Sequence, residues 1–446
     1  MDKMKGRLWA GYAETVITPP LGLGIPGYYL PRPATGIVTD LYLRAIAFSD
    51  GEKRALFFSC DCISTRNKGY QDLIEMIAKR TGVDLDSIYI ACNHSHTSFR
   101  LSAPDQVDDP EFSIYLRQLF FTFCDLAETA LEDLKPAKIK AALGEAKGVG
   151  YIRRYRMKDG TVKTNPPLGS PDIERFESEH DDSLQLIRII REGGKEILMV
   201  NFGTHADVIG GSRYCSDYSG FMVENLKGAF LGEVEAVFFN GAEGDSNHRS
   251  SFFPSDSPLK KGIFPAQRMG RILAGTVLKL YDDAKEIDFD RIASCRRILK
   301  FAKNPYDPAD VPIAKEMVQI YNEKGPKSPE LNEYRINVPE AFRILDNLDR
   351  PEFFEFHLTA IRIGQIAFVG IPGEPFQQIG MDIRKESPFP FTLVTSCTNG
   401  GEENAYYPTY EAFQQNGYEK SASLFASDCA KVITDCAEQA LREITL

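Results

Sequence analysis

The sequence predicts an α/β protein with a mixed β-sheet core and helices on both faces. Short β-rich runs alternate with helical patterns along the chain, and such alternation is typical of sheets covered by helices. Two apolar runs joined by Gly193-Gly194 predict a β-hairpin over residues 184–202. No segment has the composition of a linker, so we expect one large domain over residues 1–446.

Each remaining element follows from its local pattern. Strands are predicted where apolar, β-branched and aromatic residues form short runs, at 42–49, 54–60, 87–92, 138–146, 236–241, 365–371 and 391–397. Helices are predicted where apolar residues recur at helical spacing, at 69–82, 111–134, 219–231, 265–284, 376–386 and 421–444. Residues 303–350 are Pro-rich and charged at first and then helical, which predicts a surface insertion.

Composition and charge exclude several classes of protein. The chain is 43% hydrophobic and 26% charged, as ordinary soluble globular proteins are. Its net charge of −11 argues against a nucleic-acid partner, which requires a basic face. Residues 1–20 contain no apolar run of signal-peptide length, and no later run reaches 18 apolar residues, so we expect a cytoplasmic protein without stable membrane insertion. Nine cysteines without a CxxC pair predict reduced core thiols.

Polar clusters follow four of the predicted strands. The residues that come directly after these strands and that can bind a metal or a substrate are His94 and His96; His205 and Asp207; Glu243, Asp245, Ser246, Asn247 and His248; and Glu374. Because ligands of open α/β sheets bind beyond the carboxyl ends of strands, we expect these clusters to share one crevice. Two imidazoles and a carboxylate are the ligand set of a catalytic zinc ion with an open position.

His94 and His96 lie two residues apart in a chain that has only six histidines. In an extended segment, residues i and i+2 point to the same face. Both imidazoles could then bind one metal, or one could bind the metal while the other acts on the substrate. Spacing does not separate these alternatives, and no HExxH or CxxC motif fixes a metal site locally.

With these clusters assembled, the chain resembles the catalytic domain of neutral ceramidases, the zinc-dependent amidases that cleave the N-acyl bond of ceramide. It is similar also to their bacterial relatives of unassigned substrate. The resemblance runs from "GYAETVITPP" near residue 11 to "NGYEKSASL" near residue 424. The immunoglobulin-like domain that follows in ceramidases is absent from the sequence, so we expect the catalytic domain alone.

The resemblance implies a ligand set for one zinc ion per chain. The family's "THTHSG" element corresponds to "NHSHTS", which makes His94 a zinc ligand and His96 a catalytic residue that contacts the reacting amide. "FGTHAD" supplies His205 as the second histidine ligand, and "PGE" supplies Glu374. The family's tyrosine ligand corresponds to Tyr406 in "AYYPTYEAF".

The resemblance also implies residues on the substrate side. The family's arginine corresponds to Arg153 in "YIRRYR", with Arg154 directly behind it, and a later tyrosine corresponds to Tyr418. One segment departs from the family: its "GDVSPN" is "GDSNHR" here, so the family's serine position is occupied by Asn247, with Ser246 one residue early. We expect Asn247 to donate a hydrogen bond near an oxyanion, with Ser246 as the alternative.

These residues predict a zinc-dependent hydrolase that cleaves an amide or ester bond by means of metal-activated water. His96 would act as general acid and base or as an oxyanion donor, and Asp245 would orient a ligand histidine. The sequence contains no basic amphipathic helix for membrane binding, which favours a small acylated substrate over ceramide.

Two other functions remain open at this stage. The altered "GDSNHR" segment is compatible with a metal- or ligand-binding homologue that has lost turnover. A metal-dependent phosphoesterase would need a second metal, for which Asp207 and Asp245 are the candidate ligands.

Overall fold

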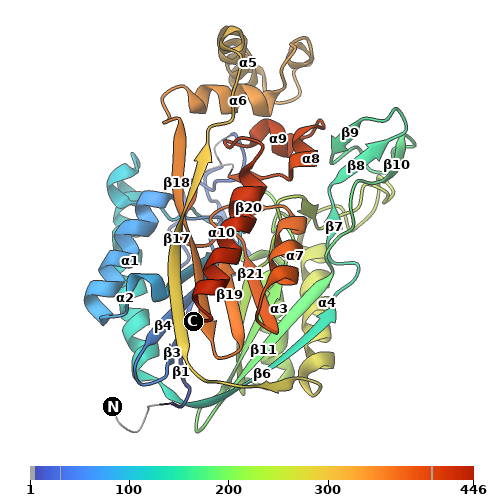
Figure 1. Cartoon of the computed structure of the whole chain (residues 1–446). Coiled ribbons are helices and arrows are strands. Elements are labelled where there is room, and N and C mark those ends of the chain that lie inside the picture. The colour runs from blue at the N-terminus through green and yellow to red at the C-terminus, as the bar shows by residue number, and fades with distance from the viewer. Residues whose placement is uncertain (1–5, 31, 403–404) are drawn as a thin grey trace.

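Two β-sheets lie face to face at the centre of the molecule (Figure 1). The structure, a computed structural model, describes residues 6–30, 32–402 and 405–446. Within these residues the larger sheet has the order β14-β12-β11-β6-β1-β3-β4-β5, with β16 beside β6. Its strands are β1 (Trp9–Val16), β3 (Tyr42–Ser49), β4 (Arg54–Cys60), β5 (Ile88–Cys92), β6 (Lys135–Glu145), β11 (Ser183–Arg191), β12 (Glu196–Phe202), β14 (Val234–Asn240) and β16 (Lys285–Ile287).

The smaller sheet has the order β17-β18-β19-β21. Its strands are β17 (Ile292–Ala302), β18 (Phe353–Ile363), β19 (Ile366–Gly370) and β21 (Phe391–Thr395). Both sheets are mixed, because β4–β5, β12–β14 and β19–β21 are parallel pairs among antiparallel neighbours. Buried residues of both sheets, such as Phe57 and Phe368, share one interior cluster. The mixed core is therefore confirmed, but it consists of two packed sheets.

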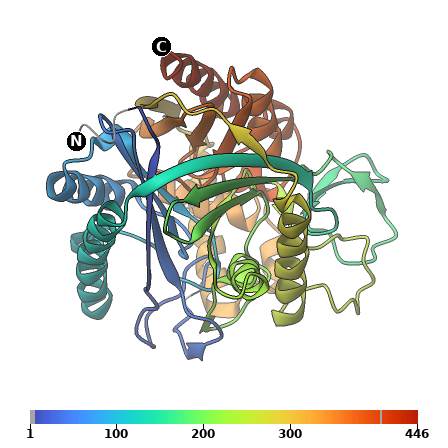
Figure 2. The same ribbon diagram turned by 90° about the horizontal axis from the view of Figure 1, so that it is seen from below.

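Helices cover the outer faces of both sheets, as the sequence predicts (Figure 1). The larger sheet is covered by α1 (Asn67–Thr81), α2 (Pro110–Glu132), α3 (Asp217–Ala229) and α4 (Ile263–Tyr281). The smaller sheet is covered by α7 (Gln377–Glu386) and α10 (Cys429–Glu443). Figure 2 shows these helices around the outside of the strands. No helix in the described part of the chain is long and apolar enough to cross a bilayer.

Residues 303–350 form a separate layer at the top of Figure 1. They contain α5 (Val311–Lys324) and α6 (Val338–Asn347), which pack around a small apolar core of their own. Arg343 of α6 donates a hydrogen bond of 3.0 Å to the carbonyl of Ser421, which joins the insertion to α9 (Tyr418–Ala422). The helix predicted over 421–444 is therefore wrong in its first turns. The chain leaves helical geometry after Ala422, because the Ser423 hydroxyl hydrogen-bonds to backbone groups.

Short strands and helices complete the fold around the sheet ends. They are β2 (Gly36–Ile37) with β13 (Arg213–Tyr214), β7 (Tyr151–Ile152) with β15 (Ser246–Asn247), β20 (Glu374–Pro375) with β22 (Tyr406–Tyr407), the small sheet β8 (Arg154–Met157), β9 (Val162–Thr164) and β10 (Ile173–Phe176), and α8 (Tyr410–Phe413). All nine cysteines are buried and free, in agreement with the predicted core thiols.

The larger sheet curls so that its two edge strands, β5 and β14, come together. The Ser59 hydroxyl in β4 donates to the carbonyl of Phe238 in β14 at 2.7 Å. Residues 396–399, which follow β21, bond to both edges: their backbone N–H groups donate to the carbonyls of Asn240 at 3.0 Å and Ile90 at 2.9 Å. The carboxyl ends of β5, β12, β14 and β21 consequently meet at one place.

Candidate metal centre

The ends of three strands bring His94, His205 and Glu374 together. His94 lies two residues beyond β5, His205 three beyond β12, and Glu374 four beyond β19. The backbone N–H of His96 donates to the carbonyl of Ala206 at 3.0 Å, so the two histidine segments are joined directly. Glu374 begins β20, which pairs with β22 and places it opposite Tyr406. The predicted crevice is thus present at the predicted strand ends.

Four side-chain atoms, from His94, His96, His205 and Glu374, lie close together in this crevice. The Nε2 atom of His94 is 3.2 Å from Nε2 of His205, 3.3 Å from Nε2 of His96 and 3.4 Å from Oε2 of Glu374. The His205 Nε2 and Glu374 Oε2 atoms are 3.5 Å apart. Ligands about 2.0–2.1 Å from a tetrahedral zinc ion are about 3.3 Å from one another. Glu374 Oε2 is buried and faces the two imidazoles at 3.4 Å and 3.5 Å, at the limit of hydrogen-bond distance, so the residues present fit a metal ion.

The second nitrogen of each ring distinguishes His96 from the other two histidines. Nδ1 of His94 lies 2.9 Å from the carbonyl of Ile63, and Nδ1 of His205 lies 3.3 Å from the carbonyl of Glu243. Such carbonyl contacts fix the tautomer that leaves Nε2 free to bind a metal. Nδ1 of His96 hydrogen-bonds to no described residue. The rings of His94 and His205 are thus held with Nε2 available for a metal, whereas no such contact holds the ring of His96.

Burial and neighbouring charge set different protonation states in this cluster. Burial would lower the pKa of His94, but the charge and hydrogen bond of Glu374 raise it to about 9. Burial would raise the pKa of Glu374, but the charge of His94 holds it below its usual value. Burial lowers the pKa of His96 to about 4 and that of His205 well below its ordinary value. His96 is therefore neutral at pH 7.

Arg153 contributes its side chain to the wall of the same cavity as the candidate metal ligands. Its Nε donates to Glu419 Oε1 at 2.8 Å and its Nη2 donates to the Gly244 carbonyl at 2.7 Å. Its guanidinium lies over the rings of Tyr406 and Tyr418, at 5.2 Å and 5.7 Å from their centroids. Arg153 lines the cavity, as the resemblance implies for a substrate-side arginine. Both Tyr406 and Tyr418 line it too.

Arg154 and Glu419 hold Arg153 in place through a network of buried ion pairs. Glu419 is fully buried, and its Oε2 accepts a hydrogen bond of 2.9 Å from Arg154. Sequence reasoning did not single out Glu419, although it follows Tyr418 directly and its carboxylate forms ion pairs with both arginines. The pair of adjacent arginines in "YIRRYR" was the available signal.

Two predicted roles in the "GDSNHR" segment do not agree with the structure. Asp245 hydrogen-bonds to no histidine among the residues that the structure describes: its carboxylate accepts the backbone N–H of Gln377, at the start of α7, at 2.9 Å. Ser246 is fully buried and its hydroxyl donates to the Glu243 carbonyl at 3.2 Å, away from the cavity. Asn247 does line the cavity. Alternation along β15 explains this, because neighbouring residues of a strand point to opposite sides.

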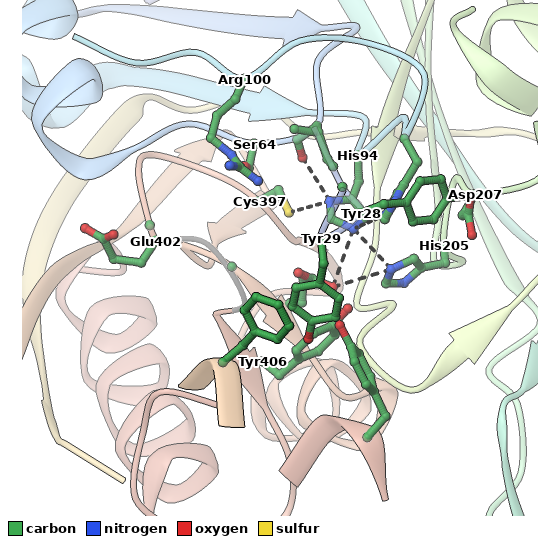
Figure 3. Close-up of a pocket in the computed structure, with 18 of the residues that line it drawn as sticks. Tyr28, Tyr29, Ser64, His94, Arg100, His205, Asp207, Cys397, Glu402 and Tyr406 are labelled. Atoms are coloured by element: carbon green, nitrogen blue, oxygen red, sulfur yellow. Dashed lines mark hydrogen bonds and ion pairs between the residues drawn. The ribbon is translucent and has the colours of Figure 1, made fainter. Parts of the chain in front are cut away.

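A cavity of about 1020 Å³ is lined by His94, His205 and Glu374. Figure 3 shows His94 within it, with His205 on one side and Cys397 on the other. Six aromatic side chains contribute to its walls: Tyr28, Tyr29, Tyr321, Phe342, Tyr406 and Tyr418. At its rim, Asp207 accepts hydrogen bonds from Tyr28 and from Lys261. Asp207 and Asp245 thus have separate partners, and neither belongs to a cluster of possible metal ligands in the described chain.

A second group of possible ligands, His94, Glu243 and Cys397, lies behind the first. Cys397 Sγ is 3.3 Å from His94 Nδ1 and 3.8 Å from Glu243 Oε1. Because His94 Nδ1 already contacts the carbonyl of Ile63, this group supports the His94 ring and leaves Nε2 as the metal-facing atom. Burial raises the pKa of Glu243 to about 8.

Comparison with known proteins places the fold. No family model matches the sequence, and no curated protein matches it significantly. Two solved structures are similar in fold: neutral ceramidase from Pseudomonas aeruginosa, and a ceramidase complexed with C2. For each the TM-score is 0.73, the sequence identity 16%, and the match covers 98% of this chain and 75% of the other. The neutral-ceramidase-like α/β fold that the sequence predicts is thereby confirmed.

Proposed function

We propose that this protein is a zinc-dependent hydrolase that cleaves an amide or ester bond of a small acylated substrate. The observation that carries the proposal is the set of three ligand atoms of His94, His205 and Glu374, which lie 3.2–3.5 Å from one another beside a cavity of about 1020 Å³. The structural similarity to ceramidases supports the same class of reaction. A zinc ion in such a site lowers the pKa of a water towards about 7 and polarises a carbonyl group.

We assign the zinc ligands to His94, His205, Glu374 and Tyr406. The first two have their Nδ1 atoms held by backbone carbonyls, which favours coordination through Nε2. Tyr406 is paired with Glu374 across β20 and β22, and its ring stacks on that of His205 with 6.4 Å between centroids, so the tyrosine lies beside the other three residues. This assignment leaves His96 for the substrate.

The remaining residues of the site have roles in proton transfer and substrate binding. His96, whose pKa is lowered to about 4 by burial, is neutral at pH 7 and can accept a proton from the attacking water and pass it to the leaving group. Arg153 is held by Glu419 with its charge towards Tyr406 and Tyr418. It can therefore stabilise the negative charge that develops on the carbonyl oxygen.

Metal content tests the ligand set. Elemental mass spectrometry of protein purified without chelator is expected to give about one zinc per chain. His205→Ala is expected to lose the metal, because it removes one prepared ligand, whereas His357→Ala, on β18 outside the cavity, keeps it. A protein that takes up no zinc when zinc is added would refute the hydrolase. Two metals per chain would favour phosphoester chemistry instead.

The same preparations separate His96 from the ligands. We expect His96→Ala to retain zinc and to lose about 10²–10⁴ in the rate of hydrolysis of 4-nitrophenyl acetate or an N-acetyl amino acid. Equal loss of zinc and activity would make His96 a ligand in place of Tyr406. Hydrolysis of 4-nitrophenyl phosphate alone, or zinc without any turnover, would favour the phosphoesterase or the binding protein respectively.

A further inference from the structure

Two asparagine side chains, Asn165 and Asn247, meet in the wall of the cavity. The backbone N–H of His248 donates to Oδ1 of Asn247 at 2.9 Å, and Nδ2 of Asn247 donates to Oδ1 of Asn165 at 3.0 Å. A backbone N–H can only donate, so it fixes which end of the Asn247 amide is the oxygen. That choice in turn fixes the Asn165 amide, whose Nδ2 is left pointing away from the pair.

The Nδ2 group of Asn165 is available for a ligand. It makes no hydrogen bond to any residue that the structure describes, while its side chain is half-buried and lines the cavity. Asn165 adopts φ +49°, a left-handed conformation that asparagine adopts more readily than most residues with a Cβ. A backbone hydrogen bond of 2.7 Å to the carbonyl of Arg153 holds it there.

We infer that Asn165 donates a hydrogen bond from Nδ2 to an uncharged acceptor oxygen of the substrate, a carbonyl or a hydroxyl, and that Asn247 is the positioning residue that fixes this donor. The inference rests on the proposed hydrolase function. It transfers to Asn165 the donor role that the sequence predicts for Asn247. Asn247 donates one of its two amide hydrogens to Asn165, whereas neither amide hydrogen of Asn165 is donated to a residue that the structure describes.

The test is a double-mutant cycle on the zinc-loaded protein with 4-nitrophenyl acetate as probe. Asn165→Gly removes the amide and suits the positive φ, so the backbone stays unstrained. We expect kcat/KM to fall about tenfold with zinc content unchanged, as loss of one substrate hydrogen bond predicts. Asn247→Ala is expected to lower kcat/KM in the wild-type background and to have no further effect in the Asn165→Gly background.

The second variant, Asn165→Asp, keeps the oxygen that accepts from Asn247 and replaces the donor by an acceptor. It should lower kcat/KM at least as far as Asn165→Gly does. Unchanged kcat/KM in Asn165→Gly or Asn165→Asp overturns the inference. So does an Asn247→Ala effect that is equally large in both backgrounds, because Asn247 would then contact the substrate itself. A wild-type protein that binds zinc and hydrolyses nothing would instead refute the proposed function.

Discussion

The backbone of His94 adopts a left-handed conformation with φ 62°, which is unusual for a residue with a side chain. On the facing segment, Cys397 and Asn399 share this conformation, with φ 45° and 61°. Each such residue costs about 1–3 kcal/mol and persists only where its surroundings enforce it. The backbone N–H of His94 donates a hydrogen bond to the Cys62 carbonyl at 3.1 Å, and Nδ1 of its ring hydrogen-bonds to the Ile63 carbonyl. The strained turn aims the imidazole at His205 and Glu374.

His248 predicts a pH dependence of stability. Its Nε2 contacts the Lys260 carbonyl at 2.8 Å, and burial lowers its pKa to about 4. In the unfolded chain the imidazole titrates near pH 6.5, so between pH 6.5 and 4 the unfolded state binds a proton that the native state does not. Stability is therefore lost as the pH falls through this window, by about 2–3 kcal/mol at pH 4.5.

The variant for this measurement is His248→Gln, whose amide nitrogen can still donate to Lys260. The free energy of unfolding of the zinc-free wild type and of the variant is measured by urea unfolding between pH 7 and 4.5. The other histidines titrate in both proteins, so their contribution cancels when the two free energies are subtracted. We expect the wild type to lose about 2–3 kcal/mol relative to the variant at the acidic end. A difference that stays constant with pH would mean that His248 is protonated in the native state.

At the scale of elements, the α5–α6 insertion forms one wall of the cavity through aromatic contacts. Tyr321 and Phe342 line the cavity from the insertion. Tyr29, from the loop before β2, stacks on Phe342 at 4.3 Å between centroids and meets the edge of Tyr321 at 5.8 Å. If the proposed function holds, this aromatic wall would limit the size of the acyl group that the cavity accepts.

Phe342→Ala is expected to change selectivity for acyl length. Removing the ring opens the wall, so kcat/KM for 4-nitrophenyl octanoate should rise at least about threefold relative to the acetate, as pocket changes of this size predict. Zinc content should stay the same. Leu348→Ala, at a partly exposed position outside the cavity, is the matched control and should leave the ratio unchanged. Loss of zinc in Phe342→Ala would show that the insertion supports the metal centre instead.

Elements with uniform apolar runs were predictable from the sequence, and elements with mixed faces were not. The predicted strands 42–49 and 54–60 have the observed bounds of β3 and β4, whose residues are almost all buried. The long strand β17 was missed, because Arg296, Arg297 and Lys300 interrupt its apolar pattern. Only part of that strand packs on the core, so its charged residues are compatible with a strand but hide it from a search for apolar runs.

The site was predictable where a local motif carries a ligand and not where the contact is distant in sequence. His94, His205 and Glu374 follow apolar strands and converge as expected. The role of Asp245 was wrong, because its partner is a backbone N–H of Gln377 more than a hundred residues away. Asn165 was not singled out from the sequence, because the direction of its amide depends on Asn247, 82 residues further along the chain.

At the scale of the whole molecule, the proposed metal centre would join the two sheets. His94 and His205 follow strands of the larger sheet, whereas Glu374 follows β19 of the smaller one. The two sheets already share an apolar interior in which Phe57 packs against Phe368, with ring centroids 4.7 Å apart. A metal bound at their carboxyl ends therefore adds a second connection between the same layers. Because the unfolded chain does not hold these ligands together, metal binding must stabilise the fold.

This coupling predicts a thermal shift. At a free zinc concentration of about 100 times Kd, binding stabilises the native state by about 2.7 kcal/mol, and for a chain of 446 residues this raises Tm by about 3 °C. Differential scanning calorimetry of chelator-treated protein with and without added zinc measures the shift. His205→Ala should show none, while His357→Ala, outside the cavity, should shift as the wild type does. An equal shift in His205→Ala would place the stabilising zinc at another site, since the proposed centre would then lack a ligand that joins the sheets.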